Sequence, residues 1–272
     1  MTDSNYKNTI FSMCGKVSVV VGGSGQIGTN SVLILLEAGS EVVILDIVEP
    51  NFNVINKCYL KKLHYFKCDI TDFKNIALVV NEVIKKFNII DCLVNHSHFK
   101  GDSKSLKPHS EFFAPVEDYP LEIWSETMDV NLTGLFLICQ KFGKVMQSQN
   151  HGVIINTAST YGIVSARESI YGDSGINSPV SYAATKAAII NFSRYLSTHW
   201  AKYNIRVNTL SPGGVANENQ SNDFVKKYSD MTPLARMARP DEYQGAILFL
   251  ASEASSYMTG SNLVIDGGWT AW

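Results

Sequence analysis

The sequence predicts an α/β fold: one doubly wound domain in which helices cover both faces of a parallel sheet of about seven strands. Strand and helix signals alternate along the 272 residues, and the strand signals are almost entirely apolar, as in strands buried on both faces. No internal repeat and no Pro/Gly-rich linker divides the chain. We therefore expect residues 1–14 to be an N-terminal extension and residues 15–272 to be one domain.

The individual elements follow from the spacing of apolar residues and from the residues that end each run. Short β-branched or apolar runs predict strands at residues 16–21, 41–45, 63–67, 90–94, 153–156, 205–210 and 262–265. Runs with helical periodicity predict helices at residues 27–38, 72–87, 121–147 (one helix or two that abut), 179–203 and 241–251.

Three long connections follow strands, at residues 96–119, 163–178 and 214–240. The last of them is rich in polar residues, and we expect it to form a mobile helical lid. Ligands of open α/β sheets bind beyond the carboxyl ends of the strands, so these loops should surround the site.

Charge and composition exclude several kinds of partner. With 23 basic and 25 acidic residues, the net charge of −2 gives no electrostatic reason to bind nucleic acid or an anionic membrane. The N-terminus lacks a signal-peptide pattern and no apolar run reaches about 18 residues, so a soluble, cytoplasmic protein is expected. The 5 scattered cysteines contain no CxxC pair and are expected to be reduced thiols. No metal is expected, because the histidines show no ligand spacing beyond His96 and His98.

A glycine-rich turn after the first strand indicates a dinucleotide site. Glycines let the backbone turn sharply and let a pyrophosphate approach the N-terminus of the next helix. An acid, Asp46, follows the turn by 18 residues, at the tip of the second strand. The expected cofactor contacts in this turn are Gly22, Ser24, Gly25, Gln26, Ile27 and Gly28.

Asp46 favours NAD over NADP. Its carboxylate can accept hydrogen bonds from the adenosine ribose and would repel a 2′-phosphate, and the glycine turn contains no Arg or Lys. At the next strand tip, Asp69 and Ile70 have two interpretations. Either the Asp69 carboxylate accepts a bond from the adenine amino group, or it helps to cap the helix ahead of Asp72.

Tyr182 and Lys186 lie four residues apart in a predicted helix, so they share one face. A phenol with a pKa of about 10 is a poor base at neutral pH, but a fixed positive charge nearby favours its phenolate. The pair can therefore carry proton transfer, although the same spacing also arises by chance on amphipathic helices.

Taken in order, the motifs resemble those of the short-chain dehydrogenase/reductase family over residues 15–269. Besides the glycine turn, Asp69, Tyr182 and Lys186, the matching residues are Asn95 in Leu-Val-Asn, Asn131 in Val-Asn-Leu-Thr-Gly, Ser159 in Asn-Thr-Ala-Ser-Thr-Tyr-Gly, residues 208–213 and Asp266 in Asp-Gly-Gly. The resemblance implies a Rossmann domain and a nicotinamide-dependent oxidoreductase. It also implies a homo-oligomer, either a tetramer or a dimer.

The resemblance further implies a catalytic tetrad of Asn131, Ser159, Tyr182 and Lys186. Tyr182 would exchange the proton of a substrate hydroxyl, and Ser159 would hydrogen-bond the same oxygen. Lys186 would lower the tyrosine pKa and bind the nicotinamide ribose, while Asn131 would help to hold a water that relays the proton. The further implied cofactor contacts are Tyr182, Lys186, Asn95, Pro212, Gly213 and Val215.

Several positions depart from the family pattern. Gln26 stands where glycine is usual, and the glycine spacing matches the family's extended branch, whereas the length and later motifs match its shorter branch. His96 and His98 stand in the usual Asn-Asn-Ala-Gly, where their imidazoles either touch the cofactor or are inert. Asn217 replaces a threonine that contacts the carboxamide in the family.

The loop 163–178 contains an insertion between Ser159 and Tyr182 that is longer than is common in the family. It either covers the substrate pocket or serves an oligomer contact. The candidate substrate contacts are Tyr161, Arg167, Tyr171 and Asn217. Their polarity predicts a hydroxyl-rich or charged substrate, and the pattern resembles bacterial members associated with sugar and flagellin-glycan biosynthesis.

The leading hypothesis is an NAD-dependent oxidoreductase that interconverts a secondary alcohol and a ketone on a polar, sugar-like small molecule. One alternative is a 3-oxoacyl-carrier-protein reductase or a general carbonyl reductase, chemistry that usually uses NADPH, which Asp46 opposes. A second alternative, from a different class, is an NAD-binding regulator without turnover.

Overall fold

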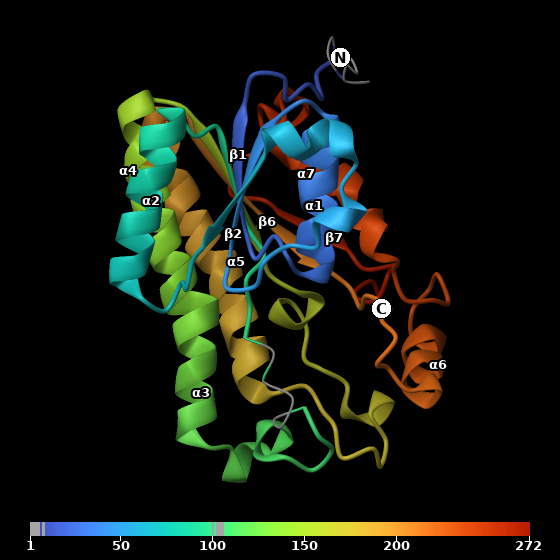
Figure 1. Ribbon diagram of the computed structural model, residues 1–272. Coiled ribbons are helices and arrows are strands. Elements are labelled where there is room, and N and C mark those ends of the chain that lie inside the picture. The colour runs from blue at the N-terminus through green and yellow to red at the C-terminus, as the bar shows by residue number, and fades with distance from the viewer. Residues whose placement is uncertain (1–5, 7–8, 100, 102–105) are drawn as a thin grey trace.

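The computed structural model describes residues 6, 9–99, 101 and 106–272, and its fold is the predicted doubly wound α/β architecture (Figure 1). The described residues form one sheet in which all strand pairings are parallel and the order is β3-β2-β1-β4-β5-β6-β7. The strands are β1 (Val17–Val21), β2 (Glu41–Asp46), β3 (Leu63–Lys67), β4 (Cys92–Asn95), β5 (Gly152–Thr157), β6 (Ile205–Pro212) and β7 (Asn262–Ile265).

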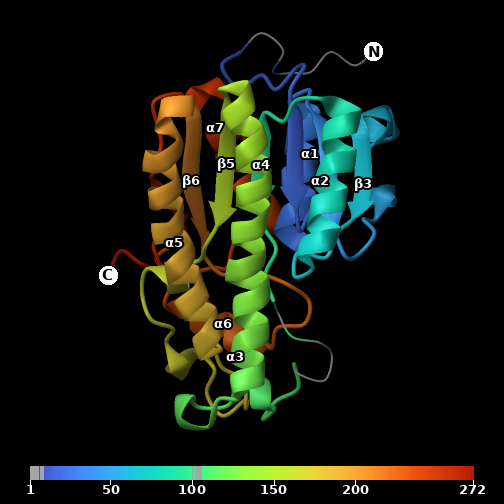
Figure 2. The same cartoon turned by 90° about the vertical axis from the view of Figure 1, so that its left-hand side faces the viewer.

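Helices cover both faces of this sheet (Figures 1 and 2). One face packs against α1 (Gln26–Glu37) and α7 (Gln244–Ala251). The other packs against α2 (Phe73–Phe87), α4 (Leu135–Gln149) and α5 (Val180–Trp200). Every residue of β1, β4 and β5 is buried, which explains why these strands are continuous apolar runs rather than alternating ones.

The segment expected as one helix or two is α3 (Leu121–Met128) joined to α4 through a π-helical turn, Asp129–Gly134. The turn packs against the tip of β3, because a Cβ at Gly134 would lie 2.8 Å from the Ile70 carbonyl oxygen. Wide turns of this kind inside helices often mark functional sites. This one carries Asn131.

The long loops gather beyond the carboxyl ends of the strands, as expected (Figure 1). The His109 amide donates to the Gly175 carbonyl at 2.7 Å, which joins the connection after β4 to the insertion. The lid contains α6 (Asn222–Asp230), and it shares a buried cluster with the insertion and the C-terminal segment. The members of this cluster are Ile170, Tyr228, Met237 and Trp269.

No helix in the described ranges is both long and apolar enough to cross a membrane. The described end of the N-terminal extension packs on the domain: Met13 is 1% exposed, and its amide donates to the Ala38 carbonyl at 2.9 Å.

Asp91 ties the amino ends of the strands together. Its buried carboxylate accepts hydrogen bonds from the Val17 amide (2.8 Å), the Lys16 ammonium (3.1 Å) and the His151 ring (3.0 Å). Burial opposes ionisation of Asp91, but the bonds from His151, Val17 and Lys16 outweigh it, so the pKa of Asp91 is lowered.

We expect Asp91→Ala to lower the free energy of unfolding by about 1–3 kcal/mol at pH 7, because the buried Val17 amide loses its acceptor. The folded-state pKa lies below the unfolded value of about 3.9, so this stabilisation is present above that value and is lost as the pH falls through the folded-state pKa. Urea unfolding at pH 7 and at acid pH measures both effects. Glu82→Ala, at an exposed position of α2, is the control, and equal losses in both variants would contradict the assignment.

Candidate active site

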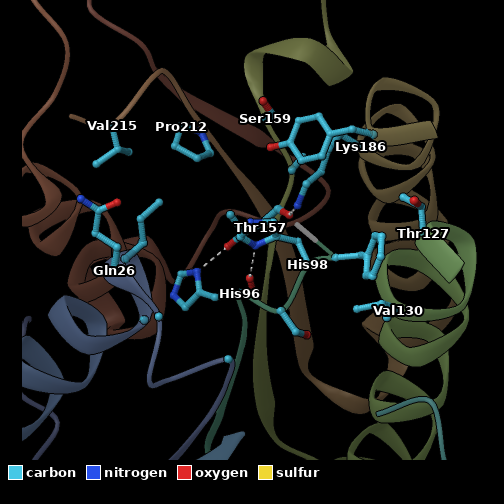
Figure 3. Close-up of a pocket in the computed structure, with 18 of the residues that line it drawn as sticks. Gln26, His96, His98, Thr127, Val130, Thr157, Ser159, Lys186, Pro212 and Val215 are labelled. Carbon is cyan, nitrogen blue, oxygen red and sulfur yellow. Dashed lines mark hydrogen bonds between the residues drawn. The ribbon is translucent and has the colours of Figure 1, made fainter. Parts of the chain in front are cut away.

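A cavity of about 700 Å³ opens at the carboxyl ends of the strands. Figure 3 shows its interior, with Gln26, Val215 and Pro212 on one side and Ser159 and Lys186 on the other. Most of the predicted site residues line it, namely Gly22, Ser24, Gly25, Gln26, Ile27, Gly28, Asp46, Asp69, Ile70, Ser159, Tyr161, Tyr171, Tyr182, Lys186, Pro212, Gly213, Val215 and Asn217. Three do not: Asn95, Asn131 and Arg167.

The glycine turn is shaped to admit a pyrophosphate. Gly22 has a φ of +75°, and a Cβ on it would lie 2.7 Å from the Ser97 amide. A Cβ on Gly28 would collide with the Gly22 carbonyl oxygen. The N-terminus of α1 carries no side-chain cap, and its first residues line the cavity. Its backbone amides and helix dipole fit an anionic group at this position.

Asp46 is fixed at the tip of β2 by backbone donors. Its two carboxylate oxygens accept from the Ser24 amide at 3.0 Å and the Val48 amide at 3.1 Å, and the Ser24 hydroxyl donates to the Val48 carbonyl at 2.7 Å. The carboxylate therefore has a defined place in the cavity wall, where it can accept hydrogen bonds from ribose hydroxyls.

The Asp69 carboxylate also lines the cavity, and one of its oxygens accepts from the Thr71 amide and hydroxyl. The side chain that caps α2 is Asp72, which accepts from the Lys74 and Asn75 amides. Asp72, and not Asp69, therefore caps α2.

The Asn95 side chain, an expected cofactor contact, is not among the residues that line the cavity. It is 2% exposed, and its amide donates to the Asn156 side chain at 2.7 Å, which in turn donates to Ser193 at 2.9 Å. These bonds join β4, β5 and α5 in the core. Asn95 thus holds the strand tips in register behind the cavity wall.

Gln26 links the glycine turn to the lid loop. Its side-chain amide donates to the Ala216 carbonyl at 2.7 Å, across 190 residues of sequence. Both Gln26 and the neighbouring Val215 line the cavity, so the bond spans the side of the cavity at the α1 N-terminus. The residue that departs from the family's glycine therefore makes a contact that glycine cannot make.

Tyr182 and Ser159 face each other from the first turn of α5 and the segment after β5. Burial raises the pKa of Tyr182, and a hydrogen bond from Ser159 opposes this rise without cancelling it. The net direction is opposite to the one expected from Lys186 alone. The Lys186 nitrogen lies 5.5 Å from the centre of the phenol ring, and burial acts more strongly on Tyr182 at this range.

Lys186 is 2% exposed, and its ammonium donates to the Thr157 backbone carbonyl at 2.9 Å (Figure 3). Burial disfavours the charged form and lowers the pKa of Lys186 to about 8. The Thr157 carbonyl is an acceptor for the positive charge at the tip of β5. This role could not be predicted from the sequence, because any residue type supplies a backbone carbonyl.

The Asn131 side chain is enclosed and 0% exposed. Its oxygen accepts from the Phe99 amide at 2.6 Å, and its amide donates to the Thr185 hydroxyl at 3.0 Å. It therefore ties the π-helical turn to the segment after β4 and to α5. Its side chain does not line the cavity.

The substrate end of the cavity is built from the insertion and the lid. Tyr161 hydrogen-bonds Tyr171, which also hydrogen-bonds Ser178, and Tyr171 stacks on Phe224 of α6 with ring centres 5.3 Å apart. Arg167, an expected substrate contact, is exposed and does not line the cavity. Among the lining residues that sequence analysis did not single out are Phe112, Asn177, Phe224, Tyr228 and Met237.

His96 and His98 both line the cavity at the tip of β4. The His98 ring lies edge-on to Tyr182, with ring centres 6.4 Å apart. His96 is 7% exposed and contacts Ser31 and Thr157. The cavity wall near Tyr182 and Lys186 is therefore polar.

A family model described as "Enoyl-(Acyl carrier protein) reductase" matches residues 23–270. An NAD-dependent glycerol dehydrogenase from Listeria innocua serovar 6a is 34% identical over 267 residues, which cover 96% of each protein. A short-chain dehydrogenase structure from Leptospira borgpetersenii serovar Hardjo-bovis with bound NAD+ is 36% identical, with a TM-score of 0.85 over 96% of this chain and 95% of that one. The chain belongs to the short-chain dehydrogenase/reductase family.

Membership of the short-chain dehydrogenase/reductase family confirms the predicted enzyme class, a nicotinamide-dependent oxidoreductase that acts on CH–OH groups. A further structural relative is a gluconate 5-dehydrogenase from Burkholderia cenocepacia J2315 in complex with NADP and tartrate. It is 27% identical, with a TM-score of 0.83 over 96% of this chain and 98% of that one. The family neighbours thus include proteins bound to NAD and to NADP.

Proposed function

We propose that this protein interconverts a secondary alcohol and a ketone on a polar, sugar-like metabolite, with NAD as the cofactor. The observation that supports this most is the convergence of the Tyr182 phenol, the Ser159 hydroxyl and the Lys186 ammonium at one cavity. The same cavity has an N-terminal helix end and a fixed carboxylate at its far side, which fit the pyrophosphate and adenosine ribose.

Tyr182 is the proton donor and acceptor in this proposal. For reduction, its hydroxyl gives a proton to the ketone oxygen, and for oxidation its phenolate takes the proton of the substrate hydroxyl. Ser159 donates a hydrogen bond to the same oxygen. The bound nicotinamide supplies or accepts the hydride. The raised pKa of Tyr182 keeps the phenol protonated at neutral pH, which suits reduction.

Lys186 stabilises the phenolate electrostatically and is held in reach of the nicotinamide ribose by the Thr157 carbonyl. Asn131 contributes through its position in this proposal, because its side chain is enclosed and already bonds Phe99 and Thr185. The π-helical turn that it occupies is where we place the water of the proton relay.

The substrate end supports a hydroxylated ligand. The phenols of Tyr161 and Tyr171 and the amide of Asn177 line the cavity there, together with aromatic faces from Phe112 and Phe224. Hydroxyls of a sugar-like molecule can pair with the former, and its C–H faces can pack on the latter. The relatives named for glycerol and gluconate act on polyhydroxy compounds. Tyr161, Tyr171 and Asn217 remain our candidate substrate contacts.

A 3-oxoacyl-carrier-protein reductase is the second candidate. The matching family model is described for an enoyl-(acyl carrier protein) reductase, which shares the acyl-carrier-protein substrate but acts on a C=C bond rather than on a ketone. The carboxylate of Asp46 weighs against this second candidate, because its chemistry usually uses NADPH. An NAD-binding regulator without turnover would have no need of the Tyr182–Ser159 arrangement.

A substrate panel tests this function. Purified protein with NAD should oxidise a member of a panel of polyols, sugars, sugar acids and hydroxyacyl thioesters, measured by NADH absorbance. The rate of oxidation should rise with pH through the alkaline range, because the raised pKa of Tyr182 delays formation of the phenolate.

Tyr182→Phe should reduce turnover by about 10²–10⁴-fold while NADH binding, followed by fluorescence titration, stays nearly unchanged. Tyr195→Phe, on the same helix but 63% exposed, is the matched control. Turnover only of the thioester would favour the reductase alternative, and unchanged turnover in Tyr182→Phe would refute the proton-transfer assignment.

Asp46 should select NAD by electrostatic repulsion of the 2′-phosphate. We expect Asp46→Ala to lower the ratio of kcat/KM for NAD to that for NADP by about tenfold, equivalent to about 1.4 kcal/mol. Glu49→Ala, which removes a nearby exposed carboxylate outside the cavity, should leave the ratio unchanged. An unchanged ratio in Asp46→Ala, or a wild-type preference for NADP, would contradict the cofactor assignment.

We further propose that the protein is a cytoplasmic homo-oligomer, a tetramer or dimer, built from the single domain of residues 15–272. The support is analogy with the family, whose members commonly associate through the long helices and the C-terminal segment. Exposed apolar side chains on these elements, Phe136, Tyr195 and Val264, are compatible with such contacts. Light scattering should give the mass of a dimer or tetramer, and a monomeric mass would refute this part of the proposal.

A further inference from the structure

His96 forms a buried bridge between two elements of the site. Its Nε2 lies 2.8 Å from the Ser31 hydroxyl on α1, and its Nδ1 lies 2.8 Å from the Thr157 hydroxyl at the tip of β5. The imidazole is 7% exposed. An asparagine, the usual residue here in the family that the chain resembles, presents both polar atoms at one end and cannot reach two hydroxyls on opposite sides.

Each ring nitrogen of His96 makes one hydrogen bond, and two tautomers fit the contacts. When the Ser31 hydroxyl donates to the Ile27 carbonyl at 3.1 Å, Nε2 carries the ring proton and the Thr157 hydroxyl donates to Nδ1. When the Ser31 hydroxyl donates to Nε2, Nδ1 carries the proton and donates to Thr157, so in both tautomers one ring nitrogen is an acceptor. Burial, together with the charge of Lys186, lowers the pKa of His96 to about 3, which keeps the ring neutral and preserves this acceptor.

Thr157 connects this bridge to the proposed catalytic lysine. The side chain of Thr157 hydrogen-bonds His96, while its backbone carbonyl accepts from the Lys186 ammonium at 2.9 Å. Figure 3 shows His96 and Lys186 approaching Thr157 from different sides. A rotation of Thr157 would therefore move the acceptor that places the Lys186 charge. The other arm of the bridge reaches Ser31 on α1, the helix whose N-terminus fits the pyrophosphate.

We propose that His96 is a positioning residue that fixes Thr157, and through its carbonyl Lys186, relative to the cofactor-binding helix α1. This inference rests on the proposed function, because it assigns Lys186 a part in the reaction. The bridge holds the Lys186 ammonium at a fixed distance from the N-terminus of α1. The charge that stabilises the phenolate is therefore positioned relative to the helix that binds the cofactor.

Three substitutions separate the parts of the bridge. Thr157→Val removes the hydroxyl but keeps the β-branched shape and the carbonyl, Ser31→Ala removes the other partner, and His96→Asn removes the bridge. Ser18→Ala is the control, because it removes an equally buried hydroxyl that pairs with Ser40 and makes no contact with this chain of bonds.

We expect His96→Asn and Thr157→Val each to lower kcat about tenfold, equivalent to about 1.4 kcal/mol in activation free energy, with KM for substrate nearly unchanged. The ascending limb of the pH profile for oxidation should move to higher pH, because a displaced Lys186 supports the phenolate less. The double variant His96→Asn/Thr157→Val should lose no more kcat than the more strongly affected single variant, because both substitutions act through the same chain of hydrogen bonds. Ser18→Ala should leave kcat and the profile unchanged.

Full activity with an unmoved pH profile in folded His96→Asn would overturn the proposal, as would losses that add in the double variant. A measurement on the wild type does not depend on variants or turnover: ¹⁵N NMR should show His96 as a single neutral tautomer with no titration between about pH 5 and 8. A ring that titrates in that range, or that exchanges between tautomers, would refute the bridge. Absence of turnover with every panel substrate would instead refute the proposed function.

Discussion

The burial of the Lys186 ammonium is the constraint on which the site depends. A cation at 2% exposure loses most of its hydration, and this loss must be compensated by fixed acceptors or by loss of the proton. The structure uses both. The Thr157 carbonyl accepts from the nitrogen, and the pKa of Lys186 still falls to about 8. The position of the Lys186 charge, which should assist Tyr182, thus depends on the position of Thr157 at the end of β5.

Buried hydrogen bonds of three asparagine side chains hold the end of β5 in place relative to its neighbours. Asn95 and Asn156 join β4 to β5 inside the core, and Asn131 joins the π-helical turn to the segment after β4 and to α5. These amides lie away from the cavity, yet each connects elements that carry a reacting group. Polar groups in such a core are costly when they are unpaired, and the Asn95 oxygen is buried without a hydrogen-bond partner in the described residues. The paired groups of the network nevertheless favour one arrangement of the strand tips.

Those features that depend on local chemistry were predictable from the sequence. Apolar runs gave the strands, the glycine turn and Asp46 gave the cofactor end, and the four-residue spacing placed Tyr182 beside Lys186. Side-chain direction was not predictable. Asn95 stands at a strand tip as expected but turns into the core, and Arg167 belongs to the insertion but lies on its outer surface. The directions of both side chains depend on which side of the strand end or loop packs against the rest of the protein, and sequence spacing does not determine this.

The balance of forces at Tyr182 was also beyond sequence reasoning, because it compares a desolvation penalty with a charge interaction at a distance. Spacing alone indicates that Lys186 should lower the tyrosine pKa, whereas burial raises it and the Ser159 hydrogen bond only moderates the rise. The consequence is functional. A phenol that keeps its proton at neutral pH is ready to protonate a ketone oxygen, while oxidation requires the phenolate that Lys186 must help to form. The position of Lys186, set through Thr157, therefore affects how readily the phenolate forms, and looseness at that strand tip should appear as a shift in the pH profile of the oxidative direction.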